Sequence, residues 1–535
     1  TRGFKELDGG GNTGFERSEG LIKAHINTDP NQRVFQKLEL KGVFSHEDSR
    51  ETYLGLTDED FAENPYRRYR ASALDEMKLW RVGLSLTHML EIGEDLDVRT
   101  VAYRHDMSRS WKKFNSFADG TNASGVLTNP TGRNAIYYNV LTGEEDSSAN
   151  NVSLNIGTNA RTFFSQGVQS TVRHRHEANT WSNKVEAGVR VHQDQIRRDH
   201  SEELYDMQAG ELQRVSGVET TYPTRNTEQS TAFALWALDQ VSFWRLTMTP
   251  GVRYEYIINT SEDRNDPTAE TIQGTQDVIV PGLGTYLEVV DNLGVLAGIH
   301  RGFSPVTPGQ SGEVRPETSI NYEGGVRYDD LASKHFEVVG FFNDYKNMVG
   351  QCTFAAGCAE QDLDDQFNAG RAWIYGAEVL ASQSFALGSP TRLLKLDLSY
   401  TFTQTEALTN FNSENPQLAE VEPGDELPYV PRHQGAISAG YEDERVAANL
   451  ALAYVSSMRE TASQGDEGPR TDSYVTLDAL VRYRLLSMFS VYTRGNNLLN
   501  AQPIASRRPY GARPISPRYV ELGIELDWGK EGTNP

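Results

Sequence analysis

Arginine is the residue type with which this sequence could bind a ligand. Many of its arginines occupy polar positions in stretches where apolar and polar residues alternate. Guanidinium groups stay protonated and bind a carboxylate through two parallel hydrogen bonds, so several that face one space could hold an anion. The alternation places these basic residues on the polar side of their stretches: Arg161, Arg173, Arg175, Arg190, His192, Arg253, Arg327, Arg482, Arg484 and Arg494.

Among these residues, Arg161 is the first candidate for binding an anionic ligand, because it lies at the end of its stretch that borders a long polar loop. Arg190 and Arg327 are the next candidates. The alternative for each arginine is an ion pair with an acidic residue on a neighbouring stretch, which would help to hold the protein wall together.

The polar loops carry charges of both signs. Three arginines of the last long loop could attract anions from outside, or be ordinary loop charges: Arg507, Arg508 and Arg513. Acidic clusters at 57–60, 144–146 and 362–365 offer the oxygen ligands that Ca²⁺ prefers, but none has the spacing of a calcium-binding loop, and we favour ordinary solvated loop charges. No nucleophile elbow, phosphate-binding loop or zinc-protease helix is found, so we expect no enzymatic activity and neither a metal nor another cofactor.

The sequence contains two cysteines, Cys352 and Cys358. Their spacing does not fit a zinc site, and no other cysteine could complete one. Either the two form a disulfide in an oxidising compartment or both are free thiols, and we favour the disulfide. Such a bridge closes a short loop and would stiffen a local surface more than stabilise the whole fold.

Two-residue alternation is the main pattern of the chain and predicts β-strands whose faces differ in polarity. In the stretch 184–193, for example, apolar residues share one face: Val185, Ala187, Val189 and Val191. The stretch 516–528 alternates in the same way near the end of the sequence. We expect about nineteen such strands and little helix.

The expected connections alternate between short turns and long polar loops. Short turns fall near residues 28–32, 91–94, 241–243, 291–293, 332–334, 388–390, 442–444 and 486–487; long loops fall at 45–78, 108–160, 193–229, 260–277, 304–315, 347–370, 406–432, 457–472 and 499–515. Strands that cross a bilayer must pair all their backbone groups, so the sheet closes into a barrel with a lipid face and a polar lumen. A soluble β-sandwich or propeller would not alternate its turn lengths so regularly.

The overall composition agrees with a membrane barrel. Hydrophobic residues make up 38% of the sequence, which is low for several buried cores but suits strands that are apolar on one face only. The formal net charge of −23 argues against nucleic acid as a partner, because phosphate binding needs clustered basic residues. We therefore expect one all-β domain at 1–528, a transmembrane antiparallel β-barrel, followed by a C-terminal tail at 529–535.

The direction of the strands predicts that the barrel is incomplete in this sequence. The first strand, at 17–27, ends in a short turn, and the last strand follows a long loop, so both run toward the periplasm. A complete bacterial barrel has an even number of strands. An odd number of N-terminal strands is therefore expected to be missing.

Several motifs resemble the barrel of TonB-dependent outer-membrane receptors. They are R-G-F-x-P followed by P-E-x-S-x-N-Y-E-x-G within 301–328, NAGRAWIYGAEV at 368–379, LPYVPRHQ at 427–434, NNLLNAQP at 496–503 and PRYVELGIELDW at 517–528. The stretches GFKELDGGGNTGFERSEGLIKAHIN near the start and ARTFFSQGVQSTVRHR at 160–175 are most similar to the ferric-dicitrate and siderophore receptor group.

This resemblance implies a twenty-two-stranded barrel that is filled by an N-terminal plug domain. The plug domain and the first strands of the barrel are expected to be missing from this sequence. It implies active import of a ferric chelate, ferric citrate or a siderophore, with the chelate as transported ligand. The implied partners are the TonB–ExbB–ExbD complex, reached through the plug, and outer-membrane lipid and lipopolysaccharide. The receptor would be a monomer in the outer membrane of a Gram-negative bacterium. Alternatives are a receptor for another cargo, such as cobalamin or a glycan, and a passive pore without a plug.

Overall fold

The structure, a computed structural model, describes residues 3–310, 312–353, 356–358, 363–466 and 468–527. Asp362 of the third acidic cluster, Trp528 of the expected last strand and the expected tail at 529–535 lie outside these residues.

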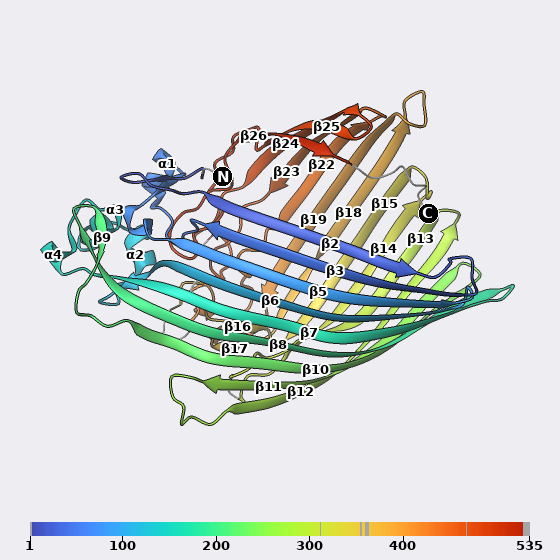
Figure 1. Ribbon diagram of the computed structural model, residues 1–535, viewed down its shortest axis with the longest axis horizontal. Coiled ribbons are helices and arrows are strands. Elements are labelled where there is room, and N and C mark those ends of the chain that lie inside the picture. Colours follow the sequence, from blue (N-terminus) through green and yellow to red (C-terminus); the bar gives the residue numbers. More distant parts are fainter. Residues whose placement is uncertain (1–2, 311, 354–355, 359–362, 467, 528–535) are drawn as a thin grey trace.

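One antiparallel sheet of 20 strands dominates the described part of the chain (Figure 1). All but one of them form a wall in which consecutive strands pair in chain order: β2 (Phe15–Asn27), β3 (Val34–Ser49), β5 (Glu76–Ile92), β6 (Leu96–Phe117), β7 (Leu154–Glu177), β8 (Trp181–Gln208), β10 (Thr221–Phe243), β11 (Leu246–Asp263), β12 (Ile272–Val290), β13 (Leu293–Ser304), β14 (Glu317–Asp329), β15 (Lys334–Lys346), β18 (Ala372–Ala386), β19 (Leu393–Ala407), β22 (His433–Glu442), β23 (Val446–Val455), β24 (Tyr474–Leu486), β25 (Phe489–Asn496) and β26 (Tyr519–Leu526). The remaining strand, β9 (Glu211–Arg214), pairs with the end of β8.

Short elements occupy the loops. Three small pairs are β1 (Glu6–Leu7) with β4 (Arg67–Arg68), β16 (Val349–Gln351) with β17 (Gln366–Asn368), and β20 (Phe411–Asn412) with β21 (Glu420–Val421). The helices are α1 (Asp58–Glu63), η1 (Arg70–Ser72), α2 (Ala123–Thr128), α3 (Asn134–Thr142) and α4 (Ser147–Asn150). Among the described residues, no helix combines the length and the apolar character needed to cross a membrane.

The connections between wall strands alternate between short turns and long loops, as predicted. In Figure 1, α1–α4 and β9 lie together beyond one end of the front wall, whereas the short turns of that wall lie at the other end. We call the loop end the outer end and the turn end the inner end.

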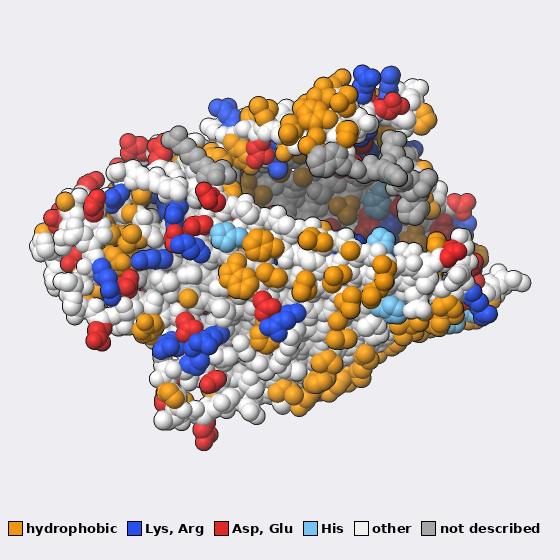
Figure 2. Space-filling model, viewed as in Figure 1, with side chains coloured by type: hydrophobic (Ala, Val, Ile, Leu, Met, Phe, Trp, Pro, Cys, Tyr) orange, Lys and Arg blue, Asp and Glu red, His pale blue; other side chains and the backbone are white. Residues whose placement is uncertain are grey.

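The two faces of the wall differ in polarity, also as predicted. On β8, Val185, Val189 and Val191 are exposed on the outer surface, and on β26 the exposed fraction of Leu522 is 83%. Figure 2 shows hydrophobic side chains gathered in a band along the outside of the front wall. On the lumen face, Arg173 of β7 instead donates to Glu186 of β8 at 2.6 Å. The band is therefore the lipid-facing surface of the barrel.

The prediction of strand ends was wrong on one side of the barrel. Residues 108–117, 154–160, 193–208 and 221–229 were expected in loops, but they are the outer parts of β6, β7, β8 and β10. Beyond the apolar band these strands have no lipid-facing side, so the regular alternation disappears from the sequence although backbone pairing continues. β8 is 28 residues long for this reason.

The outer cap, which we define as loops 50–75, 118–153 and 497–518 with the outer ends of β6–β8, has a hydrophobic core of its own. Phe114, Leu141, Leu154 and Met207 are fully buried in it. Burial of apolar surface holds these long loops in place and supports the outer ends of the wall strands.

Strands β2 and β26 are the two ends of the wall in chain order, and no pairing between them is found among the described residues. The space-filling view is hollowed between β2 and the far wall (Figure 2). The expectation of additional strands at this place stays a prediction.

Candidate functional site

Three arginines form a row on the lumen face near the outer end of the wall. Arg109 of β6 pairs in register with Arg161 of β7, and Arg161 pairs with Arg198 of β8. Residues directly opposite each other in antiparallel strands point to the same side, and neighbouring strands lie about 4.8 Å apart. We call these three residues the arginine row.

The positive charge of the arginine row is only partly neutralised. Arg198 is buried and forms an ion pair with Glu228 of β10 at 2.6 Å. Arg109 and Arg161 form no ion pair with any residue that the structure describes. Arg161 donates through Nε to Nε2 of His200 at 3.0 Å. The row therefore keeps guanidinium groups that are available to an anion.

His200 contributes to the row as a neutral acceptor. It is buried on β8 and lies beyond the apolar band, which ends at Val191 on that strand. Burial and the nearby positive charges of Arg161 and Arg198 lower the pKa of His200 to about 3. Its imidazole therefore accepts a hydrogen bond from Arg161 and adds no charge at neutral pH.

The loop between β15 and β18 reaches across to the arginine row. Cys352 and Cys358 form a disulfide in this loop. The carboxylate of Asp364, six residues beyond the disulfide, lies 3.4 Å from Nε of Arg198. Thr307 of the neighbouring loop donates its backbone N–H to the side chain of Gln366 at 3.0 Å. The row is thus covered on the outer side by a loop from a distant part of the chain.

The structure places the three predicted ligand arginines at different heights along the wall. Arg161 lies in the arginine row near the outer end. Arg190 lies in the middle of β8, where it donates to the hydroxyl of Tyr103 at 2.8 Å. Arg327 lies close to the inner end of β14 and forms an ion pair with Glu337 on β15. Of the three, Arg161 therefore shares a site with another guanidinium group, that of Arg109, which forms no ion pair with the described residues.

A second concave feature lies among the outer loops. A pocket of about 480 Å³ is lined by residues from six loops, including Asp58, Tyr429, Glu460, Arg507 and Arg508. Arg507 binds both carboxylates, at 2.9 Å in the case of Asp58. The guanidinium of Arg508 lies 4.7 Å from the centre of the Tyr429 ring. The pocket thus offers an aromatic and cationic surface whose charge is largely balanced.

The third predicted loop arginine, Arg513, is a structural residue. It donates to the backbone carbonyl of Thr52 at 2.9 Å, inside the outer cap. Burial lowers the pKa of its guanidinium to about 10. The interpretation of Arg513 as a loop charge facing outside was therefore wrong, because the last long loop packs onto the first.

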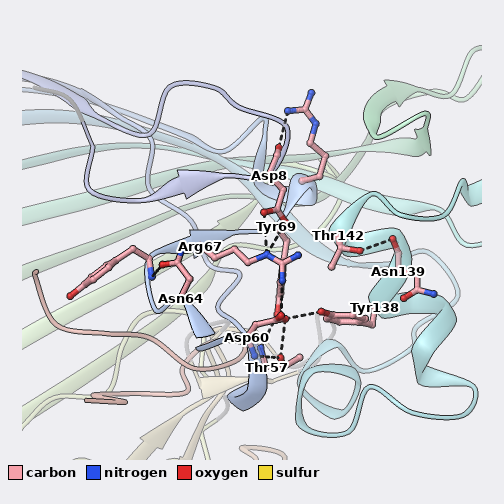
Figure 3. Close-up of polar contacts among 11 residues, drawn as sticks. Asp8, Thr57, Asp60, Asn64, Arg67, Tyr69, Tyr138, Asn139 and Thr142 are labelled. Atoms are coloured by element: carbon pink, nitrogen blue, oxygen red, sulfur yellow. Dashed lines mark hydrogen bonds and ion pairs between the residues drawn. The ribbon is translucent and has the colours of Figure 1, made fainter. Parts of the chain in front are cut away.

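Asp60 connects the loops of the outer cap (Figure 3). Its carboxylate accepts from the hydroxyl of Thr57, the N-cap residue of α1, at 2.9 Å and from Tyr138 of α3 at 2.8 Å, and it binds Arg67 at 2.5 Å. Arg67 also donates to Asp8 at 3.1 Å. Burial and the Asp60 carboxylate raise the pKa of Tyr138 to about 12, so its hydroxyl stays a donor.

Within the acidic cluster at 57–60, Asp60 is a buried structural residue rather than a solvated loop charge. The carboxylate oxygens of Asp60 are used by protein donors, and no group of acidic, histidine or cysteine residues with the arrangement of a metal site occurs among the described residues.

Sequence reasoning missed Arg109, Arg198 and His200, and it considered Asp364 only within the acidic loop cluster at 362–365. The first three lie in the outer strand extensions, which have no hydrophobic alternation, and Asp364 lies in a loop whose path depends on tertiary packing. The sequence contains a weak signal for a continued strand. An even number of positions separates Arg190 from each of four later polar residues, so a strand would place all of them on the same face: Asp194, Arg198, His200 and Glu202. Chemically, the row can hold a ligand with two or more carboxylates or other anionic oxygens.

Comparison with known proteins gives one matching family model, described as TonB dependent receptor-like, beta-barrel, over residues 25–498. A metal-pseudopaline receptor of Pseudomonas aeruginosa, CntO, is 27% identical over 57% of this chain. That match covers 42% of the relative, so the chain matches less than half the length of this curated protein.

Among solved structures, the siderophore receptor PiuA of Acinetobacter baumannii is similar with a TM-score of 0.72 and 12% identity, over 96% of this chain and 74% of that one. The ferric citrate transporter FecA in its unliganded form is similar with a TM-score of 0.67 and 17% identity, over 96% of this chain and 70% of that one. At these identities the similarity shows the barrel fold alone.

Proposed function

Because the chain belongs to the TonB-dependent receptor β-barrel family, we propose that it forms the barrel of an energised receptor that imports an anionic metal chelate through the outer membrane of a Gram-negative bacterium. The family is one of receptors and transporters rather than enzymes, which agrees with the lack of catalytic motifs. Energy would come from the TonB–ExbB–ExbD complex acting through a plug domain. Outer-membrane lipid and lipopolysaccharide would surround the apolar band.

The arginine row is the observation that carries the proposal for the ligand. Arg109 and Arg161 present guanidinium groups to the lumen without an ion-paired carboxylate among the residues that the structure describes, next to the neutral acceptor His200. A ferric chelate with free carboxylates, such as ferric citrate or a carboxylate siderophore, would complete these pairs. The low surrounding dielectric would strengthen the contacts.

A chelate of another metal is the second candidate. The relative from Pseudomonas aeruginosa is named a metal-pseudopaline receptor, and this name does not specify iron. The arginine row would bind the carboxylates of such a chelate in the same way, because the guanidinium groups contact the ligand rather than the metal.

The proposal is tested by binding to the intact protein purified from its own outer membrane. Titration with ferric citrate, with the citrate chelate of nickel and with cyanocobalamin, which has no net charge, is followed by tryptophan fluorescence and calorimetry. We expect saturable binding of an anionic chelate and none of cyanocobalamin. Uptake of the bound chelate by cells should depend on TonB.

Two results would contradict the proposal. Binding of cyanocobalamin or of a neutral oligosaccharide, without binding of any anionic chelate, would indicate a different cargo. Diffusion of small solutes through the protein in liposomes, with no saturable ligand and no dependence on TonB, would indicate a passive pore.

A further inference from the structure

Asp364 occupies the position beside the arginine row where a ligand carboxylate would bind. Its Oδ2 lies 3.4 Å from Nε of Arg198, and its charge also acts on Arg161. Arg198 is only 7% exposed. Its Nε is buried and forms no hydrogen bond with the described residues. The contact with Asp364 is therefore a charge interaction without a hydrogen bond, and a better-placed anionic oxygen could replace it.

The position of Asp364 is set by its loop and not by Arg198 alone. Its backbone N–H donates to the carbonyl of Cys352 at 2.9 Å, next to the disulfide. Its own carbonyl receives a hydrogen bond from Gln310 at 3.0 Å. Its φ of 69° lies in the left-handed region, which residues other than glycine adopt only when the surroundings hold them there. The carboxylate is thus presented to the row by a constrained backbone.

We propose that Asp364 is a specificity-determining residue that acts as an internal competitor for the arginine row. This inference rests on the proposed function and names the class of ligand more narrowly. A ligand must displace the Asp364 carboxylate from the side of Arg198 and also bind Arg109 and Arg161. Chelates with at least two anionic groups meet this requirement, whereas neutral and singly charged compounds do not.

The geometry of the row explains why two or more charges are needed. Arg109 and Arg198 are separated by two strand spacings, about 9.6 Å at the backbone, with Arg161 between them. Two anionic groups spaced along the row can bind the two outer arginines at the same time. Glu228 keeps its 2.6 Å ion pair with Arg198, so Asp364 is the carboxylate that a ligand can replace without breaking the wall network.

The test compares the intact protein with Asp364→Asn, using Asp466→Asn as the matched control, since Asp466 is an exposed residue of another outer loop. The probes are ferric citrate and the singly charged anion acetate at one fixed ionic strength. We expect Asp364→Asn to bind ferric citrate about tenfold more tightly than the wild type and to bind acetate measurably. Asp466→Asn should keep the wild-type affinities.

A second measurement needs no ligand. Phenylglyoxal modifies accessible arginines, and mass spectrometry of the digested protein gives the rate at each site. We expect Arg198 and Arg161 to react several-fold faster in Asp364→Asn than in Asp466→Asn, while the rate at Arg190 stays the same. Equal rates in the two variants, or an unchanged or weaker affinity of Asp364→Asn for ferric citrate, would overturn the inference.

Failure of the proposed function gives a different result. If the wild type and Asp364→Asn both bind no anionic chelate, the proposed function is wrong, and the inference is then decided by the reaction rates alone. Faster modification of Arg198 would still establish that Asp364 screens the row, and unchanged modification would overturn it.

Discussion

The carboxylate of Asp364 lies 3.4 Å from Nε of Arg198, although one residue belongs to the disulfide-containing loop after β15 and the other to wall strand β8. This contact encloses the arginine row between the wall and a loop that crosses the lumen. Charges in such a space are screened less by solvent than charges on an open surface. We therefore expect an anion to bind the row more tightly than the exposed arginines of the loops.

Substitution of Arg198 should separate ligand binding from general surface charge. We expect Arg198→Gln to weaken binding of ferric citrate at least about tenfold, because a charged donor of the row is lost. Arg197→Gln is the matched control, since Arg197 is the next residue on β8, faces outward and pairs with Asp199 at 3.1 Å. Titration calorimetry on the purified protein measures both. Equal losses in the two variants would indicate a nonspecific charge effect.

His200 should make stability depend on pH. Its pKa is about 3 in the folded protein and 6.5 in the ordinary case, so between these values the unfolded chain binds a proton that the folded protein does not. The free energy of unfolding should therefore rise with pH across this window, and His200 should contribute about 1.4 kcal/mol per pH unit to the rise. This contribution is lost as pH falls. We expect His200→Gln to show a shallower slope in denaturant unfolding measured from pH 4 to 6.5. A slope equal to that of the wild type would contradict the assignment.

Tyr138 should hold the two largest loops of the outer cap together. Tyr138→Phe removes its 2.8 Å hydrogen bond to Asp60 and leaves a buried carboxylate with one donor fewer. We expect a local loss of about 1–2 kcal/mol, visible as faster amide hydrogen exchange in residues 50–75 and 118–153. Tyr222→Phe, at an exposed tyrosine outside the outer cap, is the control. Unchanged exchange in both loops would show that the apolar core alone fixes the outer cap.

The two faces of β5 should respond differently to the same new charge. Leu84 is 55% exposed and faces the lipid, whereas Ser85 faces the lumen. We expect Leu84→Arg to destabilise the barrel by about 2–4 kcal/mol, because the guanidinium would enter the bilayer, and Ser85→Arg to have little effect. Folding into liposomes at increasing urea concentrations measures the difference. Similar midpoints for the two variants would contradict the assignment of the faces.

Much of the fold could be predicted from the sequence because a membrane wall imposes a two-residue period. The lipid demands apolar groups at every second position, so residues such as Val189 and Leu522 identify strands, faces and the alternation of turns and loops. The same reasoning placed Arg161 and Arg190 on the lumen face. The family resemblance was confirmed, while the ferric chelate as substrate stays a prediction.

The sequence could not predict the arginine row as a unit. Arg109, Arg161 and Arg198 lie on three strands, and their alignment depends on the register between those strands beyond the lipid, where no alternation marks a strand. The approach of Asp364 depends on how a distant loop folds over the lumen. Hydrophobic periodicity is a local property, because contact with lipid selects apolar residues within each strand separately. Register and loop packing follow from contacts between segments far apart in the chain, and only the tertiary structure decides those contacts.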